Sequence, residues 1–372
     1  MLPFVRPTIE EEDIRAVTQV LRSGWITTGP KAREFEVALE RYVGGGAHVR
    51  VVNSGTSALE IALLAAGIGP GDEVIVPSMS FVASANAVLR AGAKPVLVDV
   101  DLESRNLTAE LLRGAVTPRT RAVMPVHFAG LAADMDPIEA LARELGLRVI
   151  EDAAHAIGTR YRGRLIGGAG DLVCFSFHPN KNITSVEGGA IACFDGATAE
   201  RIERLRFHGI EKFADGSMEV DEWGGKMNLP DVNAVLGLVQ LPRLQGFVER
   251  RRELAARYRE RLPRHDCLAQ PAFGQGHGWH IFAVRVDFAR LATTRPAFQA
   301  RLADLGIATG VHYPAIHGFA MYRRMGYGPG LLPNAHTIGA QTLTLPLFPA
   351  LGEADVDGVC AALAETLGEF EA

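Results

Sequence analysis

Short runs of apolar, largely β-branched residues recur between more polar stretches in the first half of the chain. These runs are Val49–Val52, Val74–Pro77, Pro95–Val100, Ala122–Val126, Arg148–Ile150, Leu172–Phe177 and Ala190–Phe194. Most are hydrophobic at successive positions rather than at alternate ones, which is typical of strands that are buried on both faces of a sheet. The pattern therefore predicts a central sheet that is covered on both sides.

Helical patterns occupy most of the intervals between these predicted strands. They cover Ser57–Ala66, Val82–Ala91, Thr108–Ala115, Pro137–Leu145 and Ala197–Arg206. Strands that alternate with helices along the chain favour an α/β fold with a mostly parallel sheet. In such sheets ligands bind at the carboxyl ends of the strands, so we expect the functional residues there.

The pattern changes after about Asn228. The sequence predicts a long helix (Asp231–Leu262), a strand-like run (His280–Val286) and a second helix (Arg295–Leu305). A loop rich in His, Pro and Gly (Val311–Pro333) and a final helix (Ala354–Phe370) follow. We therefore predict a large α/β domain over residues 1–240 and a smaller C-terminal α+β domain over residues 241–372, joined by the long helix.

Composition narrows the class of protein. Of the 372 residues, 48% are hydrophobic and 22% are charged, and the interspersed charges sum to −5. A nucleic acid is therefore not expected as a partner. No apolar run is long enough to span a membrane or to form a signal peptide, and the four cysteines lie far apart without metal-ligand spacing. We expect a cytoplasmic protein without disulfides, bound metal or membrane contact.

Lys181 is the first candidate for chemistry. It lies in a short loop between two predicted buried strands, with Ser176 and His178 before it and Gly188-Gly189 after it. A lysine is usually a solvated surface charge. A lysine that is enclosed at the functional edge of a sheet can instead lose its proton and act as a nucleophile, because burial lowers its pKa from about 10.4.

Asp152 is the second candidate, because it follows Glu151 at the carboxyl end of a predicted strand. Two adjacent acids can be a solvated strand end or half of a metal site, but further carboxylates at ligand spacing are missing. Alternatively, Asp152 holds the proton on the pyridine nitrogen of pyridoxal phosphate, which makes that ring an electron sink. His155, three residues on, can contact the same cofactor or have a structural role.

Two strand-to-helix turns add further candidates, at Asn53–Ala58 and at Phe81. Free N–H groups at a helix N-terminus bind anions, whereas N-capping by Ser54 or Thr56 explains the first turn equally well. Phe81 can belong to the core or lie flat on a cofactor ring. No Gly-x-Gly-x-x-Gly motif follows a predicted strand. The sequence therefore lacks the main signal of a nicotinamide-dependent dehydrogenase.

Several segments resemble the DegT/StrS family of sugar aminotransferases, a branch of the fold-type-I pyridoxal-phosphate enzymes. They are Ser23–Pro30, Asn53–Ala58, Gly71–Ser78, Val149–His155, Phe175–Lys181 and Met227–Asn233. The resemblance covers essentially the whole chain. It implies the fold of that family, a large domain with a mostly parallel sheet flanked by helices and a smaller C-terminal α+β domain.

The resemblance implies a role for each residue near the cofactor ring. Lys181 would bind pyridoxal 5'-phosphate covalently and then move a proton between substrate and cofactor carbons. Asp152 would bind the pyridine nitrogen, His155 would lie near the phenolic oxygen, and Phe81 would stack on the ring. Some family members have histidine in place of the lysine and act as dehydratases, so Lys181 implies transamination.

The resemblance also implies how the phosphate is held. Gly55, Thr56 and Ser176 would bind it within one subunit. Asn228 would reach the phosphate of the neighbouring subunit, which implies a homodimer with shared active sites.

The implied reaction takes an amino group from glutamate, leaving 2-oxoglutarate and pyridoxamine 5'-phosphate, and gives it to a 3-keto or 4-keto nucleotide sugar for a surface polysaccharide or lipopolysaccharide. Further segments resemble the branch that forms UDP-4-amino-4-deoxy-L-arabinose, which favours C4. They are Gly24–Lys31, Pro125–Gly130, Phe207–Gly209 and Leu345–Pro349. Phe81, where that branch would have tryptophan, and Pro179-Asn180 depart from it.

Two histidines are candidates for substrate binding. His312 lies in Gly310–His317, which resembles the family loop that approaches the sugar, and His178 lies near Lys181. A structural hydrogen bond explains each equally well. Two other functions stay open: amination of a keto-cyclitol or another ketone, and a non-catalytic regulator that binds pyridoxal phosphate.

Overall fold

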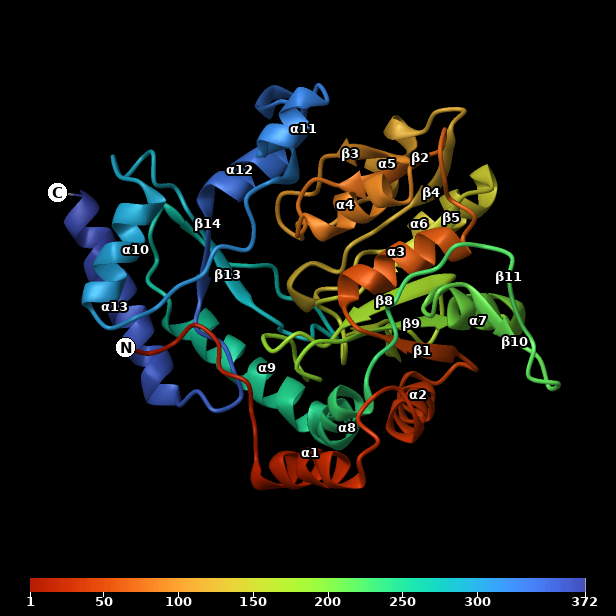
Figure 1. Cartoon of the computed structure of the whole chain (residues 1–372). Coiled ribbons are helices and arrows are strands. Elements are labelled where there is room, and N and C mark those ends of the chain that lie inside the picture. The colour runs from red at the N-terminus through yellow and green to blue at the C-terminus, as the bar shows by residue number, and fades with distance from the viewer. Residues whose placement is uncertain (372) are drawn as a thin grey trace.

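The computed structural model describes residues 1–371 and has a seven-stranded sheet at its centre (Figure 1). Its strands are β1 (His48–Val52), β2 (Glu73–Pro77), β3 (Lys94–Val98), β4 (Thr120–Val123), β5 (Arg148–Asp152), β8 (Leu172–Ser176) and β9 (Gly189–Cys193). They lie in the order β1-β9-β8-β5-β4-β2-β3. Each coincides with one of the apolar runs, apart from a few residues at the ends.

Only β9 runs against the other strands of this sheet. It pairs antiparallel with both β1 and β8, whereas the remaining pairs are parallel. Segment 177–188 contains no helix and returns the chain directly from β8 to the antiparallel β9, so the two strands form a hairpin. The carboxyl ends of β1, β2, β4, β5 and β8 therefore meet at one edge, together with the loop 177–188. The predicted mostly parallel α/β fold is confirmed.

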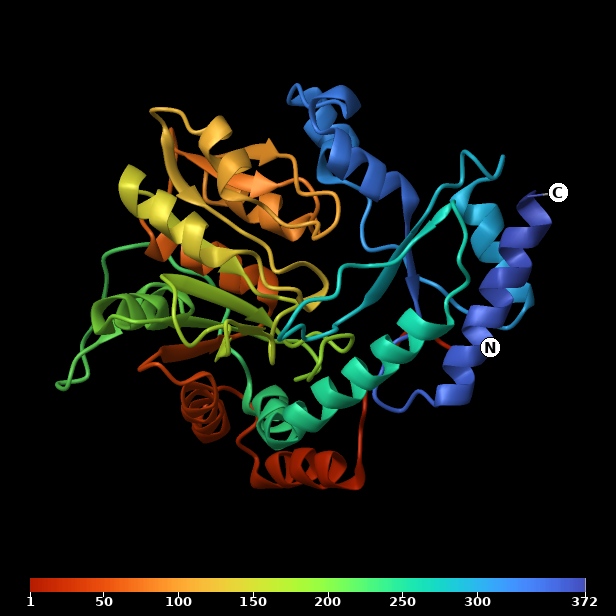
Figure 2. The same cartoon turned by 180° about the vertical axis from the view of Figure 1, so that it is seen from behind.

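Helices cover both faces of the sheet (Figures 1 and 2). The helices on one face are α3 (Gly55–Ala65), α4 (Ala83–Arg90) and α7 (Gly196–Leu205), and those on the other are α2 (Pro30–Val43), α5 (Ala109–Ala115), α6 (Met135–Leu145) and α8 (Asp231–Gln240). Successive strand residues point to opposite faces. In β2, Val74 and Val76 pack in the first layer and Ile75 in the second. This double burial explains the uninterrupted apolar runs.

Helix α1 (Glu11–Ser23) packs on α8, outside the layer that covers the sheet. It was not predicted, because only Asp13 and Val20 are buried and the rest of the helix is largely polar. Asp13 accepts a hydrogen bond from the Glu10 N–H at 2.7 Å, which caps the first turn.

The long helix that we expected from Asp231 to Leu262 is wrong as a single element. Helix α8 ends at Gln240, and α9 (Leu244–Arg261) begins after a 3-10 turn over Leu241–Arg243. Pro242 lies in that turn. A proline has no N–H to donate and its ring clashes with the preceding helical turn, so the helix is interrupted here.

The C-terminal part contains a second, three-stranded sheet. Its strands are β12 (Leu268–Ala269), β13 (Phe282–Val286) and β14 (Thr342–Leu345), and α10 (Arg295–Asp304) and α13 (Glu353–Glu371) lie side by side next to it (Figures 1 and 2). These elements share one hydrophobic core with α9. The domain boundary that we predict between residues 240 and 241 falls where α8 ends and the 3-10 turn begins. Ala372 lies outside the described residues.

The predicted loop Val311–Pro333 is less regular than its neighbours but contains short helical turns. These are η3 (Ile316–Gly318), α11 (Ala320–Arg324) and η4 (Pro329–Leu331), followed by α12 (Pro333–Gln341). Residues of this segment pack into the core of the first sheet, among them Ile316, Tyr322 and Ile338. The C-terminal part therefore reaches the edge where the strand ends meet.

The remaining elements are a 3-10 turn, η1 (Phe128–Gly130), and two small hairpins. The hairpins are β6 (Arg160–Tyr161) with β7 (Arg164–Leu165), and β10 (Ile210–Lys212) with β11 (Met218–Val220). Among residues 1–371, none of the helices combines the length and apolar character that crossing a bilayer requires.

Candidate active site

A cavity of about 310 Å³ lies at the edge where the strand ends meet. Every candidate residue predicted from the sequence lines it except Asn228. The predicted residues in its wall are Gly55, Thr56, Phe81, Asp152, His155, Ser176, His178, Lys181 and His312. The order of the strands in the first sheet brings these residues together although they are far apart in the sequence, and the C-terminal part adds His312.

Asp152 is the buried acid of the cavity. Its carboxylate accepts a hydrogen bond from the Ser84 hydroxyl at 2.7 Å and one from the Ala154 N–H at 3.1 Å. The Ser80 and Ser84 hydroxyls lie 2.6 Å apart. The Ser84 hydroxyl and the Ala154 N–H orient the Asp152 carboxylate, but neither brings a positive charge to it. Among residues 1–371, no ion pair involves Asp152. A positively charged group in the cavity would therefore find an unpaired carboxylate.

Lys181 enters the cavity from the hairpin loop between β8 and β9. Its backbone N–H donates to the His178 carbonyl at 2.8 Å, which fixes the turn that carries the side chain. Burial lowers the pKa of Lys181 to about 8, although the nearby Asp152 acts in the opposite direction. A fraction of the amine is therefore neutral near physiological pH, as a nucleophile requires.

Helix α3 begins at the cavity wall. Ser54 caps it by accepting a hydrogen bond from the Ser57 N–H at 3.0 Å, so the N-capping that we considered is present. This cap does not use the N–H groups of Gly55 and Thr56, which stand at the positive end of the helix dipole. Capping and anion binding are therefore compatible here.

Gly55 lies unusually close to strand β8. A Cβ at this position would lie 2.7 Å from the Ser176 Cβ and 3.1 Å from its hydroxyl oxygen. Only glycine lets the first turn of α3 approach the end of β8 this closely. The Ser176 hydroxyl consequently stands beside the helix N-terminus and adds a donor to the same small space.

His155 is held in one neutral tautomer. Its Nδ1 accepts a hydrogen bond from the Ala129 N–H at 3.3 Å, so Nε2 carries the proton and lies 3.1 Å from the Tyr313 hydroxyl. Burial, together with the nearby Lys181 and His312, lowers the pKa of His155 well below its ordinary value. A neutral donor is therefore fixed at this wall of the cavity.

Phe81 and the two candidate substrate histidines lie elsewhere along the cavity wall. Phe81 is 53% exposed, and its ring centroid lies 5.4 Å from that of Tyr313. His312 is buried and its Nδ1 lies 2.9 Å from the Thr344 hydroxyl, whereas His178 is exposed and pairs with Asn180 at 2.8 Å. Both histidines therefore make the structural hydrogen bonds that we considered and still line the cavity.

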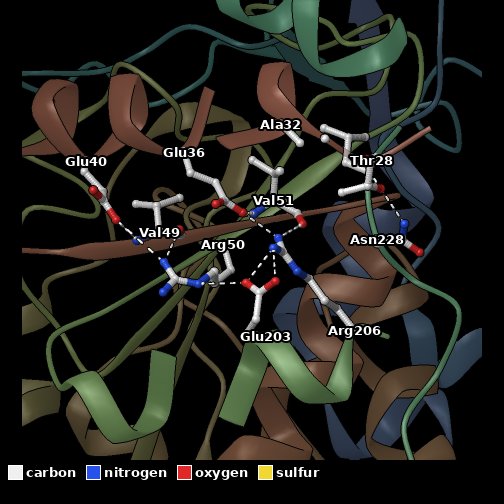
Figure 3. A network of polar contacts seen from close by, with 12 residues as sticks. Thr28, Ala32, Glu36, Glu40, Val49, Arg50, Val51, Glu203, Arg206 and Asn228 are labelled. Carbon is white, nitrogen blue, oxygen red and sulfur yellow. Dashed lines mark hydrogen bonds and ion pairs between the residues drawn. The ribbon is translucent and has the colours of Figure 1, made fainter. Parts of the chain in front are cut away.

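Asn228 lies outside this cavity. Its amide nitrogen donates to the Thr28 hydroxyl (Figure 3), and its oxygen accepts from Lys226 at 2.8 Å. Both Asn228 and Thr28 line a separate cavity of about 710 Å³, which is rich in arginine and lysine side chains. Within one chain, Asn228 therefore cannot complete the site around Lys181.

Sequence reasoning missed Glu187 and Tyr313 in the wall, and it missed Ser84, whose hydroxyl donates to the Asp152 carboxylate. Ser84 lies three residues after Phe81, and Tyr313 directly follows His312. Proximity in sequence to a predicted residue was the only available signal for either.

The site residues fit pyridoxal phosphate. A cofactor aldehyde would meet a lysine with a lowered pKa, and a protonated pyridine nitrogen would meet the unpaired carboxylate of Asp152. The phosphate would meet the helix N-terminus at Gly55, where no side chain fits. Among residues 1–371, no group of three or more His, Cys, Asp or Glu side chains is placed to hold a metal ion.

Comparison with known families agrees with this geometry. A model of the DegT/DnrJ/EryC1/StrS aminotransferase family matches residues 7–364. The chain belongs to this family. It is therefore an aminotransferase, and its fold is that of the fold-type-I enzymes.

Solved structures of similar proteins span the same length. DesV of S. venezuelae is 37% identical, with a TM-score of 0.89 over 96% of this chain and 94% of its own. The aminotransferase TlmJ of Streptoalloteichus hindustanus is 35% identical, with a TM-score of 0.91 over 100% of both chains. Spr1654 of Streptococcus pneumoniae, assigned as a sugar aminotransferase, is 30% identical. Its PMP form has a TM-score of 0.92 over 100% of both chains, and a PLP form has also been solved.

Proposed function

We propose that this aminotransferase uses pyridoxal 5'-phosphate to move an amino group from glutamate to the keto carbon at C4 of a nucleotide-activated sugar. The observation that carries the proposal is the shared cavity of Lys181, Asp152 and the N-terminus of α3. Membership of a sugar aminotransferase family and the PLP and PMP forms of Spr1654 support the same cofactor and substrate class.

Asp152 is the residue that tunes the cofactor. Bound pyridoxal phosphate supplies an electron sink for the bonding electrons at the substrate carbon, and this sink works best when the pyridine nitrogen is protonated. The Asp152 carboxylate holds that proton. Ser84 and the Ala154 N–H keep the carboxylate in place at 2.7 and 3.1 Å.

Lys181 is the proposed catalytic residue. With pyridoxal phosphate bound, Nζ would hold the cofactor covalently, with loss of water from the aldehyde. Once the amino donor had displaced it, the neutral Nζ would take a proton from one carbon and return it to another. Burial favours both tasks, because it lowers the pKa to about 8 and keeps bulk water from competing for the proton.

His155 and Phe81 orient the cofactor ring. The protonated Nε2 of His155 donates toward the phenolic oxygen, and neutral His155 adds no positive charge beside Lys181. Phe81 would lie on one face of the ring. The N–H groups of Gly55 and Thr56 and the Ser176 hydroxyl would bind the phosphate.

We further propose a homodimer with shared active sites. Asn228 faces a different cavity of its own chain, together with Thr28 and several basic residues. In a two-fold assembly this surface supplies Asn228 to the phosphate bound in the partner subunit. The lining of this cavity also contains three glutamates, and Arg206 is bound to Glu36 and Glu203, so Lys226 and Arg33 are among the basic side chains suited to a phosphorylated ligand.

The mouth of the cavity is the proposed sugar site. His178, Glu187 and His312 line it, and the His178 and Glu187 side chains lie 3.8 Å apart at their nearest polar atoms. Together they offer donors and acceptors to sugar hydroxyls. The product would be an amino sugar for a cell-surface polysaccharide or lipopolysaccharide, made in the cytoplasm.

An absorption spectrum of the purified protein tests the cofactor and the donor. We expect a visible band that gives way to the pyridoxamine phosphate band when glutamate is added. A band that does not change when glutamate is added would contradict glutamate as the donor. It would favour a non-catalytic regulator that binds pyridoxal phosphate. No band after reconstitution with pyridoxal phosphate would refute the proposal.

Turnover assays test the acceptor. With glutamate as donor, we expect a 4-keto nucleotide sugar to be aminated faster than its 3-keto isomer and faster than a keto-cyclitol. The free 4-keto sugar without its nucleotide is the matched control, and it should react poorly. Preference for the cyclitol or the 3-keto isomer would overturn the assignment.

A further inference from the structure

Strand β1 lies at the end of the sheet, and among residues 1–371 its outer edge pairs with no strand, apart from an isolated bridge between Val52 and Asn228. Side chains of α2 take the place of a strand. The Glu40 carboxylate accepts from the Val49 N–H at 2.9 Å, and the Glu36 carboxylate accepts from the Val51 N–H at 3.1 Å. Four residues of helix and two residues of strand both cover roughly 6–7 Å, so the two carboxylates match the two N–H groups.

Arg206, at the end of α7, completes the contact at Val51 (Figure 3). Its Nη1 donates to the Val51 carbonyl at 2.7 Å and to the Glu36 carboxylate at 2.5 Å, while Nη2 binds Glu203. Both backbone polar groups of Val51 are thus held by one buried ion pair. Glu36 and Arg206 are only 3% and 4% exposed.

This ion pair fixes the position of one particular residue. Val51 lies three residues before Ser54, which caps α3, and β1 leads directly into the turn at Gly55. A buried ion pair contributes little net stability, because desolvation offsets the attraction between the charges. Its directed hydrogen bonds instead specify geometry, and the geometry that they specify is the approach of β1 to the turn.

The backbone of Arg206 holds a second segment at the same place. Its carbonyl accepts from the Met227 N–H at 2.8 Å, and the Met227 carbonyl accepts from the Asn53 N–H at 2.7 Å. Arg206 therefore connects the end of β1 with the segment that carries Asn228.

We propose that Glu36 and Arg206 are positioning residues for phosphate binding, holding β1 so that the amides of Gly55 and Thr56 meet the phosphate. The proposal rests on the proposed function, in which this turn binds the cofactor phosphate. Neither side chain touches the cavity around Lys181, so each acts through the backbone.

The test compares two ligands that differ only in the phosphate. Cofactor-free Glu36→Gln protein is titrated with pyridoxal 5'-phosphate and with pyridoxal, following absorbance. The substitution keeps the shape of the side chain and removes the charge that strengthens its two hydrogen bonds. We expect the Kd for pyridoxal phosphate to rise about tenfold and the Kd for pyridoxal to change by less than about twofold.

Glu40→Gln is the matched control, since Glu40 makes the same kind of contact two strand residues further from the turn. It should leave both affinities unchanged. Equal losses for the two ligands, or equal effects of the two substitutions, would overturn the inference while leaving the proposed function intact. Failure of the unaltered protein to bind pyridoxal phosphate would refute the proposed function, and this inference with it.

A second variant covers the case in which Glu36→Gln does not fold. Arg206→Lys keeps the positive charge beside Glu36 and Glu203, but an ammonium group cannot reproduce the planar fork of donors that reaches the Val51 carbonyl and both acids. We expect the same selective loss of affinity for pyridoxal phosphate. An unchanged ratio of the two affinities would count against the proposal.

Discussion

Replacing Gly55 with alanine tests the close approach of α3 to β8. The added Cβ would lie 2.7 Å from the Ser176 Cβ, whereas two carbon atoms in contact prefer about 3.5–4.0 Å. The helix or the strand must therefore move by about 1 Å. Overpacking of this kind typically costs about 1–3 kcal/mol, so we expect the free energy of unfolding of cofactor-free Gly55→Ala protein to fall by that amount.

Denaturation by urea measures this loss, and two further variants define its cause. Gly114 lies in α5 with no atom within 4 Å of an added Cβ, so Gly114→Ala should be neutral or stabilising by up to about 1 kcal/mol. In the double variant Gly55→Ala/Ser176→Gly the clash is removed, so it should lose less stability than the sum of the two single variants. Strict additivity, or a Gly55→Ala protein as stable as the original, would refute the steric argument.

Other predictions concern the charged groups of the site. The lowered pKa of Lys181, about 8 against 10.5 for a free side chain, means that the unfolded chain binds more protons than the folded one between these values. The stability of the cofactor-free protein should therefore rise with pH from about 8 to about 10.5, and urea titrations of Lys181→Met should lack this rise. Lys181→Ala should fold and bind the cofactor without a covalent bond, with transamination essentially abolished; substantial turnover would contradict the catalytic role. Asp152→Ala should retain the cofactor poorly and lose activity, and Ser84→Ala should lower kcat about tenfold through the same carboxylate; wild-type rates in either would remove the pyridine-nitrogen role.

Much of the first sheet could be predicted because its strands are buried on both faces. Double burial leaves uninterrupted apolar runs such as Leu172–Phe177, and those runs mark the strands directly. The parallel order then places their carboxyl ends together. For this reason Asp152, Ser176 and the turn at Gly55 could be assigned to one place from the sequence.

One of the residues that were missed, Tyr313, reaches the site through long-range packing. Tyr313 belongs to the C-terminal half and approaches His155 only because Ile316 and Tyr322 pack into the core of the first sheet. No local pattern encodes that contact. The break at Pro242 had a local signal, but the apolar periodicity on both sides of it favoured one continuous helix.

The contact between His155 and Tyr313 also determines when the site can close during synthesis of the chain. The two residues are 158 positions apart. At about 5–20 residues per second, a ribosome needs roughly 8–30 s to make the intervening segment. Throughout that interval the strand ends that carry Asp152 and Lys181 lack the wall supplied by the C-terminal half. Capture of the cofactor in a closed site therefore has to wait until the segment that carries Tyr313 has been made.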